Sequence, residues 1–251
     1  KVIMIILEAG LNHLGKVKIA NKILSYFLKS NSKHLTFMLH NKKFYQNSNN
    51  NNYKLPITFY KKAILLAHKK NKKIGLSVCD TETFNELSNL KFDFYKLLGI
   101  AINNKDLIQK LKKKKKLIYI SLAKGSNSSI NKCLKYFGTK NKLNLIYTSM
   151  SYSEKDIDLK RISYLKNKFH LPTGYGHHFK NFLPIYLSTY FKPDFYFFYI
   201  KLKSNLKLRY PDNDHALFEN EIDKVKANIE SIKIMLKRKK LNTKIKLRNQ
   251  A

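Results

Sequence analysis

The stretch "VIMIILEAGLNHLGKVKIANKILSYFL" (residues 2–28) contains the two patterns that decide the fold. Its first part, "VIMIIL" (2–7), is a continuous apolar run, which is typical of a strand buried on both faces. Its last part, "VKIANKILSYFL" (17–28), has apolar residues at i, i+3, i+4 and i+7, which predicts a helix that packs through one side. A strand followed by a helix is the repeating unit of an α/β protein.

The same alternation continues to the end of the chain. Further strand-like runs lie at 35–39, 74–78, 92–98, 117–122, 143–149, 171–176 and 194–200, and further helical stretches at 57–70, 82–90, 105–114, 129–137, 158–167, 182–191 and 218–236. Such a series in 251 residues predicts an α/β fold, a single-domain (β/α)₈ TIM barrel over residues 1–236. A doubly wound open sheet is the alternative, but no GxGxxG or Walker A run follows any strand, which removes its commonest cofactor signatures.

The charge balance raises the question of nucleic-acid binding. There are 50 Lys and Arg against 16 Asp and Glu, a formal net charge of +34. Almost all of the positive residues are lysines spread along the chain, and lysine lacks the arginine fork that favours base and phosphate recognition. We therefore rank nucleic-acid binding below enzymatic and other binding roles, and expect the positive field to attract anionic substrates.

The remaining bulk features indicate a cytoplasmic protein without membrane association. Only Cys79 and Cys133 are present, too few for a disulfide framework. The apolar runs at 2–7 and 195–200 are too short for a signal peptide core or a membrane span. We expect a mobile polar loop at 41–54 and a basic tail at 237–251.

Polar side chains follow the predicted strands. In a barrel, function collects at the carboxyl ends of the strands and in the loops after them. A ring of carboxylate, ammonium, hydroxyl and imidazole groups there suits an anionic substrate and a metal ion. The candidate residues are Glu8, Asn12, Ser77, Lys96, Ser121, Ser151, Tyr152, His178, Asp214 and His215.

Several of these residues stand in motifs that occur in a fixed order. They are "EAGLNHLG" (8–15), "YK" (95–96), "TSMSY" (148–152), "LPTGYGHH" (171–178) and "PDNDH" (211–215). Over about residues 2–236 the chain resembles the catalytic barrel of the sialic acid synthase family, whose motifs run EAG-x-NH-x-G, YK, CTSSYP, GYSDH and PGPDH. We expect no antifreeze-like C-terminal domain of the kind that the family carries.

The resemblance implies a transferase of the nonulosonic acid class. Such enzymes condense phosphoenolpyruvate with an N-acylated amino sugar, of the N-acetylmannosamine type, to a nine-carbon 2-keto sugar acid and release phosphate. This chemistry serves cell-surface polysaccharide biosynthesis, and a homodimer is a possible assembly.

The resemblance also assigns roles to the candidate residues. It implies that a divalent metal, Mn²⁺ or Mg²⁺, polarises the sugar aldehyde. His178 would be a ligand of that metal, whereas His177 is expected to face solvent. The implied catalytic residues are Glu8, Asp214 and His215, and the implied substrate-binding residues are Asn12, Ser77, Lys96, Ser121, Ser151 and Tyr152.

The chain departs from the family pattern at four places. Tyr147 occupies the position of the other metal histidine, and a neutral phenol is a poor ligand for a divalent ion. Thr36 replaces a lysine, Ala101 lies where the family has SGE, and "KLK" with Lys203 replaces ERH or EKH. These departures motivate an alternative, a barrel that has lost catalysis and binds a sugar phosphate or a protein partner.

Overall fold

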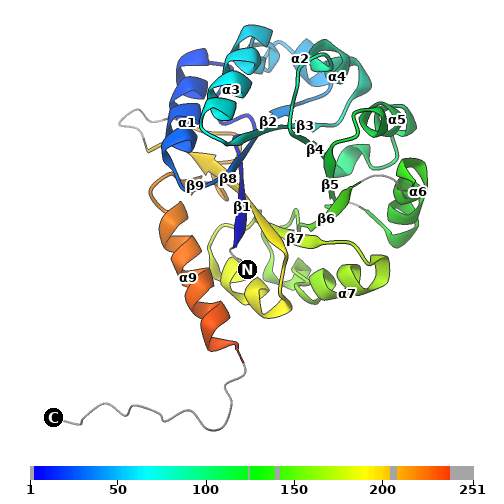
Figure 1. The fold of residues 1–251 in the computed structure, drawn as a ribbon, viewed down its shortest axis with the longest axis vertical. Helices are drawn as coiled ribbons and strands as arrows, with labels where there is room; N and C mark the ends of the chain where they lie inside the picture. The colour runs from blue at the N-terminus through cyan, green and yellow to red at the C-terminus, as the bar shows by residue number, and fades with distance from the viewer. Residues whose placement is uncertain (1–2, 124, 139–141, 204–207, 238–251) are drawn as a thin grey trace, which may run out of the picture.

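Eight parallel strands form a closed barrel in the structure, a computed structural model that describes residues 3–123, 125–138, 142–203 and 208–237 (Figure 1). Each strand pairs with the next along the chain, and β1 pairs with β8 to close the barrel, with Met4 opposite Phe195 and Glu8 opposite Tyr199. The TIM-barrel prediction is confirmed, and the open-sheet alternative is wrong. The strands are β1 (Met4–Glu8), β2 (His34–Leu39), β3 (Lys73–Val78), β4 (Phe94–Leu97), β5 (Leu117–Ser121), β6 (Leu143–Tyr147), β7 (Thr173–Gly176) and β8 (Phe195–Lys201).

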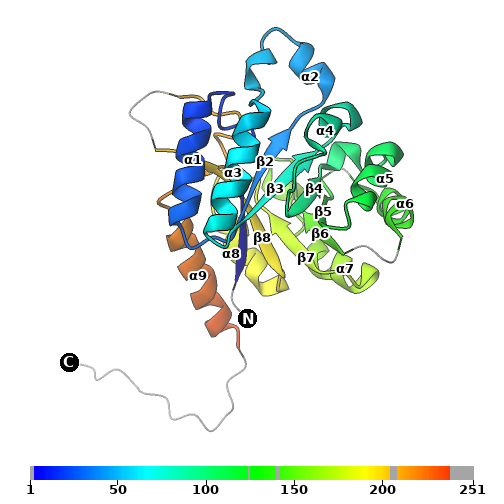
Figure 2. The same ribbon diagram turned by 45° about the horizontal axis from the view of Figure 1, so that its top comes forward.

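Helices surround the barrel on its outside (Figure 2). The first helix buries Ala20, Ile23, Leu24 and Phe27, the spacing that predicted it from sequence. Side chains cap several helices, as where Asp80 accepts a hydrogen bond from the Thr83 N–H at 3.1 Å. The helices are α1 (Val17–Lys29), α3 (Ile57–Lys69), α4 (Thr81–Leu87), α5 (Lys105–Lys113), α6 (Asn127–Phe137), α7 (Lys160–Phe169), α8 (Leu183–Ser188) and α9 (Ile222–Met235).

The inside of the barrel is filled by aromatic rings. Tyr119 packs edge-on against Phe195 and Phe197, with ring centroids 5.0 and 5.1 Å apart. Gly75 makes room for another ring, because a Cβ atom there would lie 2.2 Å from the ring of Phe94. This packed interior leaves only the two ends of the barrel open to ligands.

Two segments differ from the sequence predictions. The predicted loop at 41–54 contains α2 (Lys42–Gln46) and the 3₁₀ helix η1 (Asn51–Tyr53), because the Asn41 side chain caps α2 and Phe44 stacks on His40 with centroids 4.1 Å apart. Residues 217–218, partly inside the predicted last helix, form β9 (Leu217–Phe218), which pairs with β8. Short 3₁₀ helices η2 (Gly99–Ala101), η3 (Glu154–Asp156) and η4 (Thr189–Phe191) complete the structure, and the predicted tail falls almost wholly outside the described residues.

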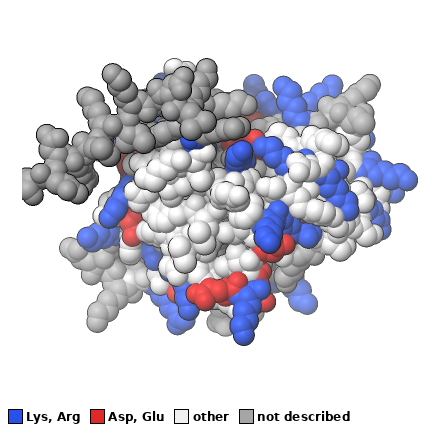
Figure 3. All heavy atoms as spheres, turned by 90° about the horizontal axis from the view of Figure 1, so that it is seen from below, with Lys and Arg blue, Asp and Glu red and all other residues white. Residues whose placement is uncertain are grey.

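The surface carries its positive charge in scattered positions. Figure 3, which views the molecule from below Figure 1, shows an uncharged middle with Lys and Arg around it and Asp and Glu among them. Leu183 and Leu187 of α8 and Tyr190 of η4 are exposed apolar residues. Among the described helices, none has the length and apolar character needed to cross a bilayer.

Candidate active site at the carboxyl end of the barrel

A cavity of about 210 Å³ opens at the carboxyl ends of the strands. Residues from seven different parts of the chain line it, as expected for a site at this end of the fold. They include Lys96 of β4, Ser121 of β5, His178 after β7, Tyr199 of β8, and Asp212 and His215 in the loop between β8 and β9. The structure thus brings four of the predicted residues to one cavity: Lys96, Ser121, His178 and His215.

A buried ion pair lies beside this cavity. The Lys96 Nζ atom donates a hydrogen bond to Glu8 Oε2 at 2.9 Å, and the two side chains are 5% and 0% exposed. Ser77 Oγ donates to the same oxygen at 2.9 Å, and the Gly10 N–H donates to Oε1 at 3.3 Å. Buried charges are stable only when they are paired and hydrogen-bonded, so these contacts hold Lys96 in place.

The neighbouring strands β2 and β3 complete the support of Glu8. Ser77 stands beside Lys96 in the register of β3 and β4. Thr36, which replaces the family's lysine, lies with its Oγ1 atom 3.0 Å from Ser77 Oγ. Thr36 and Ser77 are both fully buried, and neither lines the cavity. The predicted substrate residue Ser77 therefore contacts Glu8 and does not line the cavity.

The two adjacent histidines point in opposite directions. The His177 N–H donates to the Phe197 carbonyl at 3.0 Å, which continues the β7–β8 pairing, and consecutive side chains of an extended segment face opposite sides. His177 is buried against Phe182 and Phe198, with centroids 6.4 Å away in each case. The prediction that His177 faces solvent is wrong, and burial lowers its pKa to about 3.

His178 faces the cavity and packs against two other rings. It stacks on His215 with centroids 4.4 Å apart and an interplanar angle of 22°, and meets the Tyr199 ring edge-on at 4.9 Å. Burial, with the nearby His215 and Lys96, holds the pKa of His178 well below its usual value. His178 is therefore a neutral imidazole at neutral pH.

Side chains outside the cavity hold the loop at 211–215 over the mouth. The buried Asn12 accepts from the Asp212 N–H at 3.1 Å and donates to the Ile200 carbonyl at 2.9 Å. Lys201 donates to the Asn213 carbonyl at 2.5 Å. The predicted substrate residue Asn12 thus positions the loop. Asp214, predicted as catalytic, is exposed and lies outside the cavity lining.

Asp212 is a site residue that sequence reasoning missed. It lines the cavity, and burial, followed by the charge of Glu8, raises its pKa to about 7. The motif glycine Gly10 has φ +52°, and a Cβ atom there would lie 2.6 Å from Asp212 Oδ2. This close approach is a reason for glycine in "EAG", but the sequence alone does not reveal which residue approaches it.

A second hollow of about 440 Å³ adjoins the cavity and shares Ala123 and Met150 with it. Tyr147 lines this hollow, and its hydroxyl accepts a hydrogen bond from the Asp158 N–H at 2.7 Å. Ser151 also lines it and donates to Asp156 Oδ2 at 2.5 Å. The structure therefore separates Tyr147 and Ser151 from the cavity that His178 lines. Tyr152, in contrast, places its hydroxyl 3.0 Å from His215 Nδ1.

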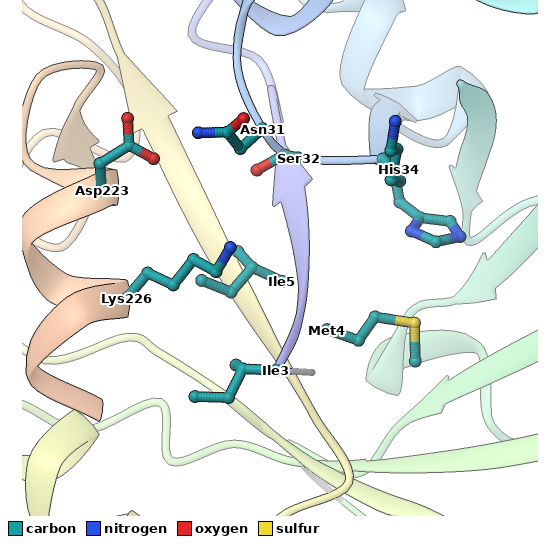
Figure 4. A pocket seen from close by; sticks show the side chains of 9 residues that line it. Ile3, Met4, Ile5, Asn31, Ser32, His34, Asp223 and Lys226 are labelled. Atoms are coloured by element: carbon teal, nitrogen blue, oxygen red, sulfur yellow. The ribbon is translucent and has the colours of Figure 1, made fainter. Parts of the chain in front are cut away.

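A further pocket, of about 270 Å³, lies at the opposite, amino end of the barrel. Asp223 and Lys226 project into it from α9, and Asn31 and Ser32 from the segment before β2 (Figure 4). Active sites of TIM barrels lie at the carboxyl end of the strands. We therefore place the candidate site at the mouth that contains Lys96.

Donor atoms for a metal ion are present in the mouth. Among the described residues, no group of three or more His, Cys, Asp or Glu side chains is arranged to hold a metal. Imidazole lone pairs lie in the ring plane, so the stacked rings of His178 and His215 do not point at one ion. Asp212 Oδ2 and His215 Nε2, however, are buried without hydrogen-bond partners, and a carboxylate oxygen and a neutral imidazole nitrogen are ordinary metal ligands.

Comparison with known proteins identifies the family. The sequence model of the NeuB family matches residues 9–240. The chain belongs to the NeuB family. The family prediction from the ordered motifs is thereby confirmed, and NeuB membership supports a sialic-acid-synthase-like enzyme.

Several solved structures share the barrel fold of this chain. The N-acetylneuraminic acid (sialic acid) synthetase of Leptospira borgpetersenii serovar Hardjo-bovis, solved with citrate, has a TM-score of 0.85 and 22% identity, over 97% of this chain and 88% of that one. A spore coat polysaccharide biosynthesis protein of Bacillus subtilis has a TM-score of 0.79 and 18% identity, over 94% and 69%. A phospho-2-dehydro-3-deoxyheptonate aldolase of Thermotoga maritima has a TM-score of 0.72 and 10% identity, over 94% and 70%. Comparison with curated protein sequences finds no match.

Proposed function

We propose that the protein condenses phosphoenolpyruvate with an N-acylated amino sugar of the N-acetylmannosamine type, in the cytoplasm. The products are a nine-carbon 2-keto sugar acid and phosphate. The observation that carries this proposal is the buried Lys96–Glu8 pair beside a cavity that Ser121 and His178 also line. Membership of the NeuB family supports the same reaction class.

Phosphoenolpyruvate is a small anion, and Lys96 and Ser121 are suited to hold it. The ammonium of Lys96 is fixed by Glu8 on one side, and the residue lines the cavity on the other. A charge that is already positioned when substrate binds requires little reorganisation, which is the source of most electrostatic catalysis. In this proposal Lys96 and Ser121 orient the enol carbon toward the sugar.

We place the aldehyde group of the sugar beside the stacked imidazole rings of His178 and His215. A divalent metal bound there would supply Lewis acidity to the aldehyde oxygen. The enol carbon forms a bond to the aldehyde carbon while the aldehyde C=O π bond opens and its oxygen takes up a proton. Water adds to the resulting cation and loses a proton, and the C–O bond to phosphate then breaks, which releases phosphate and forms the keto group. Glu8 assists in proton handling, and Tyr152 and Asp214 belong to the loops that close over the sugar.

The alternative is a barrel that retains binding and has lost the reaction. It is favoured by Tyr147, whose hydroxyl is already bonded to the Asp158 backbone, and by Lys201, which stands where the family has an acid and is bonded to Asn213. Such a protein would bind phosphoenolpyruvate or a sugar phosphate without turnover.

Phosphate release distinguishes the two functions. The full chain is incubated with phosphoenolpyruvate, Mn²⁺ and N-acetylmannosamine, with a matched reaction that omits the sugar. We expect sugar-dependent phosphate and an equal amount of a 2-keto acid product. Calorimetric binding of phosphoenolpyruvate without phosphate release from any N-acylated hexosamine would contradict catalysis and leave the degenerate barrel.

A further inference from the structure

We propose that Asp212 and His215 form the metal-binding pair of this chain, and that Asp212 takes the place of the ligand that β6 lacks. The inference rests on the proposed function for the role of the metal, and concerns which side chains hold the ion. It assigns a function to Asp212, a residue of the "PDNDH" motif that was not among the predicted site residues.

A substitute ligand is required because β6 cannot supply one. Tyr147 stands at the position of the second metal histidine, and its hydroxyl oxygen accepts the Asp158 N–H at 2.7 Å. Tyr147 also lines the adjacent hollow and is absent from the lining of the cavity that contains His178. The side chains that line that cavity and are good divalent ligands are Asp212, His178 and His215.

The geometry selects Asp212 and His215 from these three. His215 Nε2 lies 3.6 Å from Asp212 Oδ1, close to the separation of two neighbouring ligands that each stand about 2 Å from one ion. His178 stacks on the flat side of His215, so its in-plane lone pairs run beside those of His215 and do not converge with them.

The unpaired atoms of this pair point to a missing partner. The His215 side chain is 8% exposed, and its Nε2 atom has no hydrogen-bond partner. Asp212 Oδ2 is buried and likewise without a partner. Buried polar atoms are nearly always hydrogen-bonded, because a buried group without a partner loses the water that it bonded in the unfolded chain. A cation bound by His215 Nε2 and the Asp212 carboxylate, whose Oδ1 atom lies 3.6 Å from Nε2, would give both side chains a partner.

Surrounding residues already orient the pair as metal sites require. The Tyr152 hydroxyl lies 3.0 Å from His215 Nδ1, which leaves Nε2 as the free nitrogen. Asn12 accepts the Asp212 N–H, and Lys201 holds the next residue, Asn213. Ligands of protein metal sites are typically fixed by such hydrogen bonds from outside.

The position of Asp212 in the motif explains why the change can compensate. The family motif PGPDH reads "PDNDH" here, so Asp212 stands where the motif has glycine, a residue without a side chain. Residue 147 therefore has a phenol where the family motif has an imidazole, and residue 212 has a carboxylate where the motif has no side chain, in two adjoining hollows at the carboxyl end of the barrel. The glycine of "EAG" leaves room for the new side chain, since a Cβ atom at Gly10 would clash with it.

Direct measurement of Mn²⁺ binding tests the pair without substrate or turnover. The metal-free full chain is titrated with MnCl₂, and free Mn²⁺ is followed by electron paramagnetic resonance. We expect one site in the native protein, and Asp212→Asn and His215→Gln should each weaken it by at least about 10-fold. Asp223→Asn, the same change at the amino end of the barrel, is the matched control and should bind like the native protein. Thermal melts confirm that each variant is folded.

Three outcomes would overturn the inference. Native-like Mn²⁺ binding in folded Asp212→Asn would exclude the carboxylate. Loss of binding in His178→Gln but not in His215→Gln would assign the imidazole ligand to His178. Absence of Mn²⁺ binding in the native chain would remove the pair, and if sugar-dependent phosphate release persisted with chelator present, the proposed function would stand while this inference failed.

Discussion

Two buried lysines at opposite ends of the barrel differ in what their ammonium groups contact. Lys96 at the carboxyl end and Lys72 at the amino end are 4% and 6% exposed. Lys72 Nζ donates to the carbonyl oxygens of Phe27, Ser30 and Ser32, at 2.6, 2.5 and 2.8 Å. Lys96 Nζ donates to one carboxylate oxygen of Glu8 within the described part of the chain.

The difference separates a structural lysine from a candidate functional one. An ammonium has three N–H donors, and Lys72 uses all of them on the backbone at the end of α1 and just beyond. Lys96 donates one hydrogen bond within the described part of the chain, its ammonium lies over the rings of Phe197 and Tyr199 at 4.9 and 5.2 Å, and the residue lines a cavity. The two lysines are therefore buried to a similar extent. They differ in the number of hydrogen bonds that each ammonium donates to the protein, three for Lys72 and one for Lys96 among the described residues.

The largest expected effect is on activity at the mouth. Lys96→Met should lower phosphate release by at least about 100-fold, because it removes a fixed charge from the anion site. Lys42→Met is the matched control, since Lys42 pairs with Glu82 on the surface and should be neutral. A Lys96→Met protein with native activity would place the anion site elsewhere.

A second variant separates this loss from misfolding. Lys96→Met alone leaves the buried Glu8 without its counter-ion, whereas Glu8→Gln combined with Lys96→Met removes both charges. We expect the double variant to recover most of the urea-unfolding free energy and none of the activity. Recovery of both would mean that the pair is only structural.

The next largest effect concerns stability at the amino end. Lys72→Met should lower the free energy of unfolding by about 1–3 kcal/mol, because buried carbonyl groups lose their donor. Phosphate release per folded molecule should stay unchanged. A comparable loss of activity in this variant would erase the distinction between the two lysines, and urea unfolding with parallel assays measures both quantities.

The smallest effect concerns acid stability on the helix side of β7. Burial lowers the pKa of His177 to about 3, so the unfolded chain takes up this proton first as the pH falls below about 6.5. The free energy of unfolding is therefore unaffected by protonation of His177 above about pH 6.5, and it decreases as the pH falls from there toward 3. His177→Phe should therefore flatten the decline of unfolding free energy between pH 7.5 and 5, and should change it by less than about 1.5 kcal/mol at pH 7.5. An unchanged slope would contradict the burial of His177.

Much of the site could be predicted because it follows from the barrel. Once eight strands alternate with helices, Glu8, Lys96, Ser121 and His178 must come to one end. Asn12 and Ser77 belong to the same region, but the structure shows them supporting other residues. Their hydroxyl and amide groups can bind a substrate or a neighbour equally well, and only packing decides between the two.

The order of apolar runs by itself determined an α/β protein of alternating parallel strands and helices and the end at which function collects, because parallel strands with helical crossovers have few ways to bury both faces of a sheet. The pairing of β1 with β8 decided in favour of the closed barrel over the open sheet. Only the tertiary structure decided that His177 is buried against Phe182 and Phe198, and that Asp212, not Asp214, lines the cavity. Those choices depend on contacts between residues far apart in the sequence, such as Asn12 and Asp212, which are 200 positions apart. Such contacts leave no local pattern in the sequence.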